Sequence, residues 1–281
     1  MMTSNFIDLL VKDSSSSQQF IAAVENIKSY SQWITSFSNT GNSSVDKVLS
    51  TAKTNDAQWY NTIFPTYLNM PATVLSKSST IDSDLNMLLT LNSQLDGSDD
   101  KKVLSSIGQY ATNLLTVLTD LQNITSGLGK NLIQYQNNLA QDSQSIAQAY
   151  QTIEGEINTE NGSIASDQSK LNALEHASSK DKKKIKDAKD LIRSEQQKLA
   201  TLQSQAKLMY KGKALIDQAV QSSTFLGNYW RTIAGNLIGS MALLKTISTQ
   251  PADVMKADLD QSKSTWEQIK EEYQEIDQTI K

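Results

Sequence analysis

The sequence predicts an all-α fold: an elongated helical bundle with a long antiparallel coiled-coil hairpin and a tail bundle of shorter helices. Only 3 prolines and 11 glycines occur among the 281 residues, so few positions interrupt a helix. Apolar residues also recur at steps of three and four along most of the chain, which is the period of an amphipathic helix. Two long patterns of this kind, at 107–174 and 185–220, flank a charged segment.

The N-terminal part of the chain predicts short helices. A first amphipathic helix ends at "NTGNSS", where Gly41 breaks the helix and Ser44 is placed to cap the next one. Pro65 and Pro71 bracket an expected connector, because proline disfavours the helical conformation of the residue before it. Thr80 is then placed to cap a third helix.

The outgoing arm of the hairpin, 107–174, has the heptad spacing of a coiled coil. From Leu121 the apolar steps are three, four and four to Leu132, which places Ile124 in the core. This eleven-residue phase predicts a local relaxation of the left-handed supercoil. A polar residue, Asp142, occupies a heptad position further along the same arm.

The returning arm carries apolar residues seven apart from Ile185 to Val220. Two arms of this length, separated by "EHASSKDK", predict an antiparallel helical hairpin. Its tip is expected near Ser178 and Ser179.

Three glycines mark a possible joint in this hairpin. Pairing about the tip places Gly127 and Gly129 at the same height as Gly227. Glycine weakens a helix by about 1 kcal/mol relative to alanine. Glycines that face each other across two helices therefore predict a shared bend or hinge.

The most apolar region, 224–247, predicts a helix with a broad apolar face in the tail bundle. Gly235 and Gly239 have the GxxxG spacing that lets helices approach closely in membranes, and here we expect them to admit a neighbouring helix of the bundle. Only 13 residues between Arg231 and Lys245 lack charge, too few for a bilayer core about 30 Å thick. The candidate site residues of this helix are Trp230, Ile233, Gly235, Leu237 and Gly239.

These segments predict a single elongated domain over 1–281. The tail bundle is expected at about 1–125 and 226–281, and the shaft and polar head hairpin at about 126–225. The shorter helices at both ends of the chain can pack beside the base of the hairpin.

The residue types argue against catalysis. The chain contains one histidine, His176, and no cysteine, so neither a histidine-based metal cluster nor a catalytic triad can be assembled. A solvated position in the hairpin is the expected place of His176. The net charge of −4 provides no general attraction to nucleic acid. We therefore expect no enzyme, no catalytic, cofactor or metal site, no small-molecule substrate and no nucleic-acid partner.

The charged segment "HASSKDKKKIKDAK", 176–189, is a candidate contact site. One interpretation is a solvated helix start. The other is attraction to anionic lipid headgroups or to an acidic partner, worth up to about 1 kcal/mol per basic residue near a charged membrane. The candidate contact residues of this head are Lys180, Lys182, Lys183, Lys184 and Lys186.

A family resemblance follows from the order of these segments. Short helices and a very long hairpin precede an apolar helix with "LGNYWRTIAGNLIGSMALLKTI" and a tail with "ADLDQSKSTWEQIKEEY". This arrangement resembles the α-helical pore-forming toxins of the cytolysin A superfamily, above all components of haemolysin BL, non-haemolytic enterotoxin and their tripartite relatives. The resemblance implies a secreted rod that is soluble before it assembles with homologous subunits into a pore in a target host membrane.

The chain departs from the family pattern in the head. Membrane-spanning members carry a markedly hydrophobic hairpin there, and residues 158–195 of this chain contain no such run. The resemblance therefore implies a non-enzymatic partner subunit of a multi-component toxin. A structural coiled-coil spacer or adaptor without membrane activity is the alternative, because apolar heptads and a polar tip are equally expected in such a protein.

Overall fold

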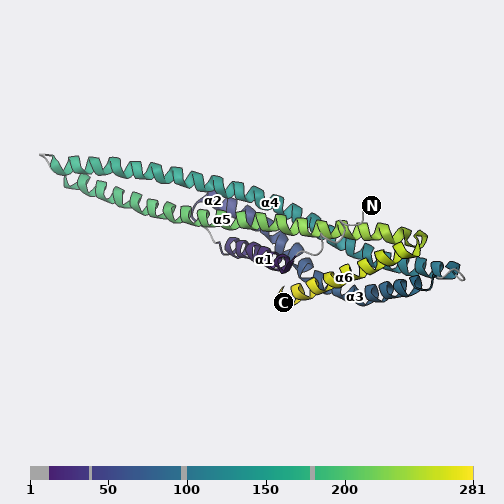
Figure 1. Ribbon diagram of the computed structural model, residues 1–281. Coiled ribbons are helices and arrows are strands. Elements are labelled where there is room, and N and C mark those ends of the chain that lie inside the picture. Colours follow the sequence, from purple (N-terminus) through teal and green to yellow (C-terminus); the bar gives the residue numbers. More distant parts are fainter. Residues whose placement is uncertain (1–12, 38–39, 96–99, 178–180, 281) are drawn as a thin grey trace. The chain divides into compact units, whose positions relative to one another are not determined.

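The computed structural model describes residues 13–37, 40–95, 100–177 and 181–280. Every regular element in these ranges is helical, which confirms the all-α prediction (Figure 1). The six α-helices are α1 (Asp13–Thr35), α2 (Ser43–Gln58), α3 (Phe64–Asn92), α4 (Asp100–His176), α5 (Lys182–Thr246) and α6 (Ala252–Ile280). A π-helical turn, η1 (Trp59–Ile63), joins α2 to α3, and a 3-10 turn, η2 (Ile247–Thr249), follows α5.

The chain divides into two compact units. Unit 1 draws its described residues from Met1–Asn26, Ala57–Gln136 and Gln221–Lys281, and unit 2 consists of Ile27–Asp56 and Asn137–Val220. Helices α1, α4 and α5 contribute residues to both units. Unit 2 therefore includes the end of α1 and nearly all of α2, segments that the sequence-based division assigns to the tail. The single-domain organisation stays a prediction.

The core of unit 1 is a cluster of large aromatic side chains. Trp230 of α5 is fully buried, and its ring centroid lies 6.1 Å from that of Tyr67 on α3 and 6.2 Å from that of Tyr273 on α6. Phe20 of α1 stacks on Tyr67 at 4.8 Å. Aromatic pairs at such distances stabilise a fold beyond the area that they bury. The cluster thus ties together helices from both ends of the chain.

The expected connector between Pro65 and Pro71 is wrong, because α3 is helical through both prolines. Pro65 lies in the first turn of α3, directly after the π-helical turn η1, so the chain is helical on both sides of it. Pro71 lies inside the helix and is buried, and α3 packs along α6, so tertiary packing offsets the lost hydrogen bond. Thr80 consequently lies within α3 and caps no helix.

The start of α2 also differs from the prediction. Helix α1 ends at Thr35, so Gly41, with a φ of +79°, lies in the connector and does not itself end the helix as expected. The capping residue, however, is Asn42 in place of Ser44. The Asn42 side-chain oxygen accepts hydrogen bonds from the backbone N–H of Ser44 at 3.1 Å and of Val45 at 3.4 Å.

Helix α4 keeps one heptad phase through the segment where an eleven-residue phase is expected. Thr125 is 1 % exposed, whereas Ile124 is only half-buried. The buried steps from Leu121 are thus four, three and four to Leu132, and the expected phase change is wrong. The Thr125 hydroxyl donates to the Leu121 carbonyl at 2.9 Å, so a threonine can occupy this core position without an unpaired donor.

Unit 2 contains the antiparallel arms of the hairpin, and α4 and α5 lie side by side there (Figure 1). Glu160 of α4 forms an ion pair with Lys198 of α5 at 2.6 Å, and Glu175 of α4 with Lys189 of α5 at 2.8 Å. Residue numbers therefore rise along one helix as they fall along the other, as the predicted hairpin requires. The expected tip residues Ser178 and Ser179 lie outside the described residues.

Candidate functional site

Two findings, on metal ligands and on membrane-spanning helices, apply to any candidate site among the described residues. In the described ranges, no three side chains of histidine, cysteine, aspartate or glutamate are grouped so that they could hold a metal ion. No helix among these same residues is long and apolar enough to cross a membrane.

The start of α5 presents the cationic end of the hairpin. Asp181 caps the helix, and its carboxylate oxygen accepts hydrogen bonds from the backbone N–H of Lys183 at 3.0 Å and of Lys184 at 3.1 Å. The bond from Lys184 is the main cause that lowers the pKa of Asp181. The cap stabilises the start of α5, on which the following lysines lie.

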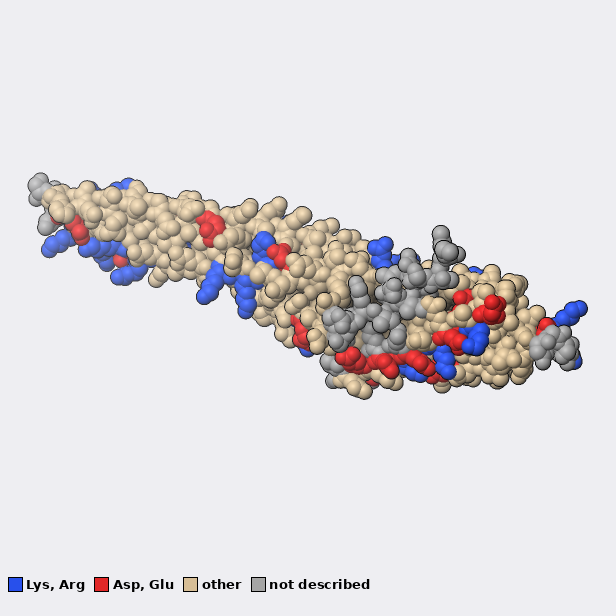
Figure 2. Space-filling view, viewed as in Figure 1, with Lys and Arg blue, Asp and Glu red and all other residues tan. Residues whose placement is uncertain are grey.

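The lysines of this end are exposed, and Figure 2 shows basic side chains gathered around it. Lys184 lies 3.7 Å from Asp181. Lys182, Lys183 and Lys186 form no ion pair with any described residue, so their charges are available to an anionic surface. Lys180 lies outside the described residues, and contact through this head stays a prediction.

His176 is the last residue of α4 and is exposed. Its Nδ1 lies 2.7 Å from the Asn172 carbonyl oxygen of the preceding turn. The solvated hairpin position expected for this residue is confirmed.

The three hinge candidates lie within unbroken helices. Helices α4 and α5 are continuous through Gly127, Gly129 and Gly227. The predicted proximity is correct for Gly129, since a Cβ built on it would lie 3.8 Å from the Gly227 carbonyl oxygen and 3.4 Å from Cγ of Arg231, whereas a Cβ on Gly127 would meet no atom of the described residues within 4 Å. Gly129 and Gly227 thus allow a close approach of two helices, and a hinge at this place stays a prediction.

The apolar part of α5 contributes both to the core and to the surface of unit 1. Trp230 belongs to the aromatic cluster, and Ile233 and Leu237 line a cavity. A Cβ built on Gly235 would meet no atom of the described residues within 4 Å. The expected close approach of a neighbouring helix at Gly235 is therefore wrong, because this glycine faces away from the bundle. The side chain of Ile238 on this exposed part of the helix is 53 % exposed.

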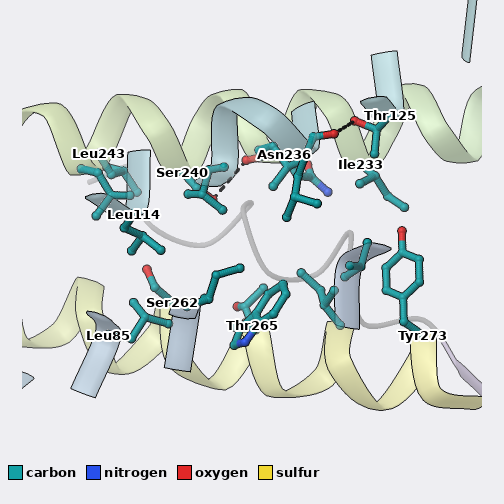
Figure 3. Close-up of a pocket in the computed structure, with 18 of the residues that line it drawn as sticks. Leu85, Leu114, Thr125, Ile233, Asn236, Ser240, Leu243, Ser262, Thr265 and Tyr273 are labelled. Atoms are coloured by element: carbon teal, nitrogen blue, oxygen red, sulfur yellow. Dashed lines mark hydrogen bonds between the residues drawn. The ribbon is translucent and has the colours of Figure 1, made fainter. Parts of the chain in front are cut away.

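The cavity lies between α3, α4, α5 and α6 and encloses about 80 Å³. Its walls are mostly leucine, isoleucine, valine and methionine side chains. Among its polar lining residues, Asn236 of α5 and Thr265 of α6 approach it from opposite helices (Figure 3). The Nδ2 of Asn236 and the Oγ1 of Thr265 are buried and form no hydrogen bond with the described chain. A buried polar atom of this kind is rare in a folded protein.

Unit 2 contains a buried carboxylate cluster, formed by Tyr30, Ser31, Asn55, Asp56 and Asp142. Asp56 of α2 is 1 % exposed and Asp142 of α4 is 2 % exposed. The Ser31 hydroxyl of α1 donates to Asp56 at 2.5 Å, and the Asn55 amide donates to Asp142 at 2.9 Å. The cluster therefore connects α1 and α2 to α4 through polar groups.

Burial and the carboxyl groups of the cluster shift the pKa values of Asp142 and Tyr30. Burial raises the pKa of Asp142 to about 6, the hydrogen bond from Asn55 acts against this rise, and the charge of Asp56 adds to it. Burial and the two neighbouring carboxyls also raise the pKa of Tyr30 well above its ordinary value. Asp142 could be suspected from its polar side chain at a heptad position, whereas nothing in the sequence pairs it with Asp56.

The fold is shared with solved structures of tripartite α-pore-forming toxin components. The SmhB pore from Serratia marcescens is 12 % identical, with a TM-score of 0.53, over 92 % of this chain and 98 % of that one. The AhlB pore from Aeromonas hydrophila is 12 % identical, with a TM-score of 0.52, over 99 % and 98 %. The soluble AhlC triple head mutant from the same organism is 10 % identical, with a TM-score of 0.51, over 91 % and 98 %.

At these identities the likeness concerns the fold, and at that level it confirms the resemblance to the tripartite toxins. No protein-family model matches the sequence, and no curated protein matches it.

Proposed function

We propose that this chain is a non-enzymatic subunit of a multi-component α-pore-forming toxin, secreted in a soluble form and acting with homologous subunits on a target host membrane. The observation that carries the proposal is the extent of the shared fold. The SmhB, AhlB and AhlC chains are each covered over 98 % of their length. These neighbours include components described as pores and one described as soluble, which supports a protein with both states.

The head of the hairpin supports the role of a partner subunit. The segment 158–195 contains no long apolar run, and the start of α5 exposes Lys182, Lys183 and Lys186. Burial of several lysines in the hydrocarbon of a bilayer is costly. The membrane-crossing hairpin is therefore assigned to another subunit, with which this chain assembles.

The exposed lysines also fit the second candidate, a coiled-coil spacer or adaptor that never engages lipid. Such a protein would use the same buried heptads and would keep its polar end in water. The two candidates differ in whether the chain joins homologous helical proteins on a membrane.

Assembly can be tested by flotation of vesicles, with the purified chain alone and together with helical proteins of similar length encoded by neighbouring genes. A toxin subunit is expected to float with the vesicles as part of a large complex when its partners are present. If the chain stays in the soluble fraction at its original sedimentation coefficient in every combination, the spacer role replaces the toxin role.

A further inference from the structure

We propose that the cavity of unit 1 is a binding site for one unbranched aliphatic chain that ends in an uncharged oxygen headgroup, as in a long-chain alcohol or a monoacylglycerol. The inference concerns the resting protein by itself and does not rest on the proposed toxin role.

The shape of the cavity suits a single chain. Its lining extends from Met70 to Leu85 on α3 and from Asp258 to Tyr273 on α6, and fifteen residues of helix span about 22 Å. A volume of about 80 Å³ distributed over such a length leaves a narrow passage. With carbon–carbon bonds of about 1.5 Å, an extended zigzag chain advances about 1.3 Å per bond, so a chain of roughly 12 to 16 carbons, about 14 to 19 Å long, fits within this length.

The walls suit the same ligand. Leucine and isoleucine side chains face the cavity from all four helices: examples are Ile81 of α3, Leu118 of α4, Ile233 of α5 and Ile269 of α6. An apolar cavity excludes water and accepts an apolar guest, because water finds few hydrogen-bond partners on such walls. Leu243 lines the cavity and is 40 % exposed, so it lies where a chain can enter.

Two polar groups point to an oxygen on the ligand. The Nδ2 of Asn236 donates hydrogen bonds, and the Oγ1 of Thr265 can donate or accept. Neither atom has a partner in the described chain, and Thr265 is only 5 % exposed. The two side chains face the cavity from α5 and α6 (Figure 3). A hydroxyl or carbonyl oxygen of the ligand beside either side chain would provide a missing hydrogen bond.

The charge of the lining excludes an acidic headgroup. Asp258 is the one charged residue among the described residues that line the cavity. A fatty-acid carboxylate would meet this acid with no basic side chain to balance it. Asp258 would attract an alkyl ammonium headgroup, but such a group has no acceptor for the Asn236 donor. The site should therefore prefer an alcohol over an acid of the same length, and an alcohol is also the ligand that can accept from Asn236.

Trp266 provides a local reporter for this site. It lines the cavity, whereas Trp33, Trp59 and Trp230 do not. Dodecanol with bromine on its chain should quench the fluorescence of Trp266 in a saturable manner, and unbrominated dodecanol should reverse the quenching. Trp266→Phe should abolish the quenching. Dodecanoate should need at least about a ten-fold higher concentration than dodecanol to reverse it.

Two variants test the contacts. Asn236→Leu removes the donor and keeps the side-chain size, and it should weaken binding of brominated dodecanol by about ten-fold or more. Ser240→Met should also weaken binding, because its longer side chain occupies the space of the ligand. Asn228→Leu is the matched control, since Asn228 lies on the exposed face of the same helix and should leave binding unchanged.

Quenching that persists in Trp266→Phe, or that is equal in the two asparagine variants, would show nonspecific partition and overturn the proposal. Absence of saturable quenching would overturn it as well, as would reversal by dodecanoate as effective as that by dodecanol. A cooperative thermal transition in Asn236→Leu shows that its lost affinity is not due to unfolding. None of these results bears on assembly with partners, which the flotation experiment measures separately.

Discussion

Gly212 of α5 lies directly beneath the indole ring of Trp33 of α1 in unit 2. A Cβ built on Gly212 would overlap with both Cη2 and Cζ2 of Trp33. Trp33 is 7 % exposed, so its rigid ring has little room to move. The missing side chain of this glycine is therefore what allows α1 to pack on α5.

The first prediction concerns this contact. Gly212→Ala should destabilise the protein by about 1–3 kcal/mol, because overpacking outweighs the gain in helix propensity. Urea unfolding followed by circular dichroism measures the effect. Gly155→Ala and Gly162→Ala are matched controls on α4, since a Cβ at either position would meet no atom of the described residues within 4 Å. These controls should stabilise by up to about 1 kcal/mol, and equal effects at all three glycines would contradict the close contact.

The second prediction concerns pH. The folded pKa of Asp142 is about 6, above the unfolded value near 4, so the folded state binds the proton more tightly. The free energy of unfolding should thus fall as pH rises from about 4 to about 6 and stay reduced above that range. Asp142→Asn removes the buried charge and keeps an acceptor for Asn55. It should stabilise by roughly 1–3 kcal/mol at about pH 8 and have little effect at about pH 4.

Unfolding curves of this variant at the two pH values provide the measurement. Asp187→Asn is the control, because Asp187 is exposed on α5 of the same unit. A stabilisation by Asp142→Asn that is the same at both pH values would show that Asp142 does not titrate in this range.

The third prediction concerns the ion pair between the arms of the hairpin. The Glu160 side chain is 7 % exposed and faces α5, whereas the Lys198 side chain is 65 % exposed. Lys198→Ala should destabilise the protein, because it leaves a carboxylate buried without its cation. Glu160→Leu in the Lys198→Ala background should recover stability, since the position belongs to the buried face of α4. If the double variant is no more stable than Lys198→Ala, the unpaired carboxylate is not the cause of the loss, and the prediction is contradicted.

The fourth prediction concerns the cationic end. Replacement of Lys182, Lys183 and Lys186 by glutamine should weaken binding to vesicles that contain phosphatidylserine by roughly 10- to 100-fold at low salt. The same replacement of Lys101, Lys102 and Lys211, which are exposed elsewhere, changes the net charge equally and should have a much smaller effect. Equal losses in the two sets would mean that net charge governs binding, and that the hairpin end has no special role.

The heptad pattern predicted the long helices well, because repeated burial of apolar residues dominates the stability of a coiled coil. It failed where polar side chains enter the core. Thr125 is buried through a hydrogen bond to its own helix, and an apolar pattern does not show this. The pattern does place Asp142 at a core position, but it does not show the hydrogen bond from Asn55 of α2. Pro71 was assigned to a connector because local preference disfavours it in a helix, yet packing along α6 overrides that preference.

The candidate sites were predicted less completely than the helices. The lysines at the end of the hairpin are neighbours in the sequence, so the local cluster of charges was enough to predict a cationic segment there. The carboxylate cluster combines residues from α1, α2 and α4, and the cavity combines residues from α3 to α6. Which of these distant side chains face each other depends on the register between helices, and a single sequence contains no direct signal of that register.

The proposed function implies that this chain permeabilises membranes only together with homologous subunits. Release of a dye from lipid vesicles or target cells, measured with the purified chain alone and then with its candidate partner proteins, tests this claim most directly. We expect the chain alone to release no dye. The complete mixture should release dye, and this release should fall when the chain is omitted. Release by the chain alone, or release by the partners that is the same without it, would contradict the account.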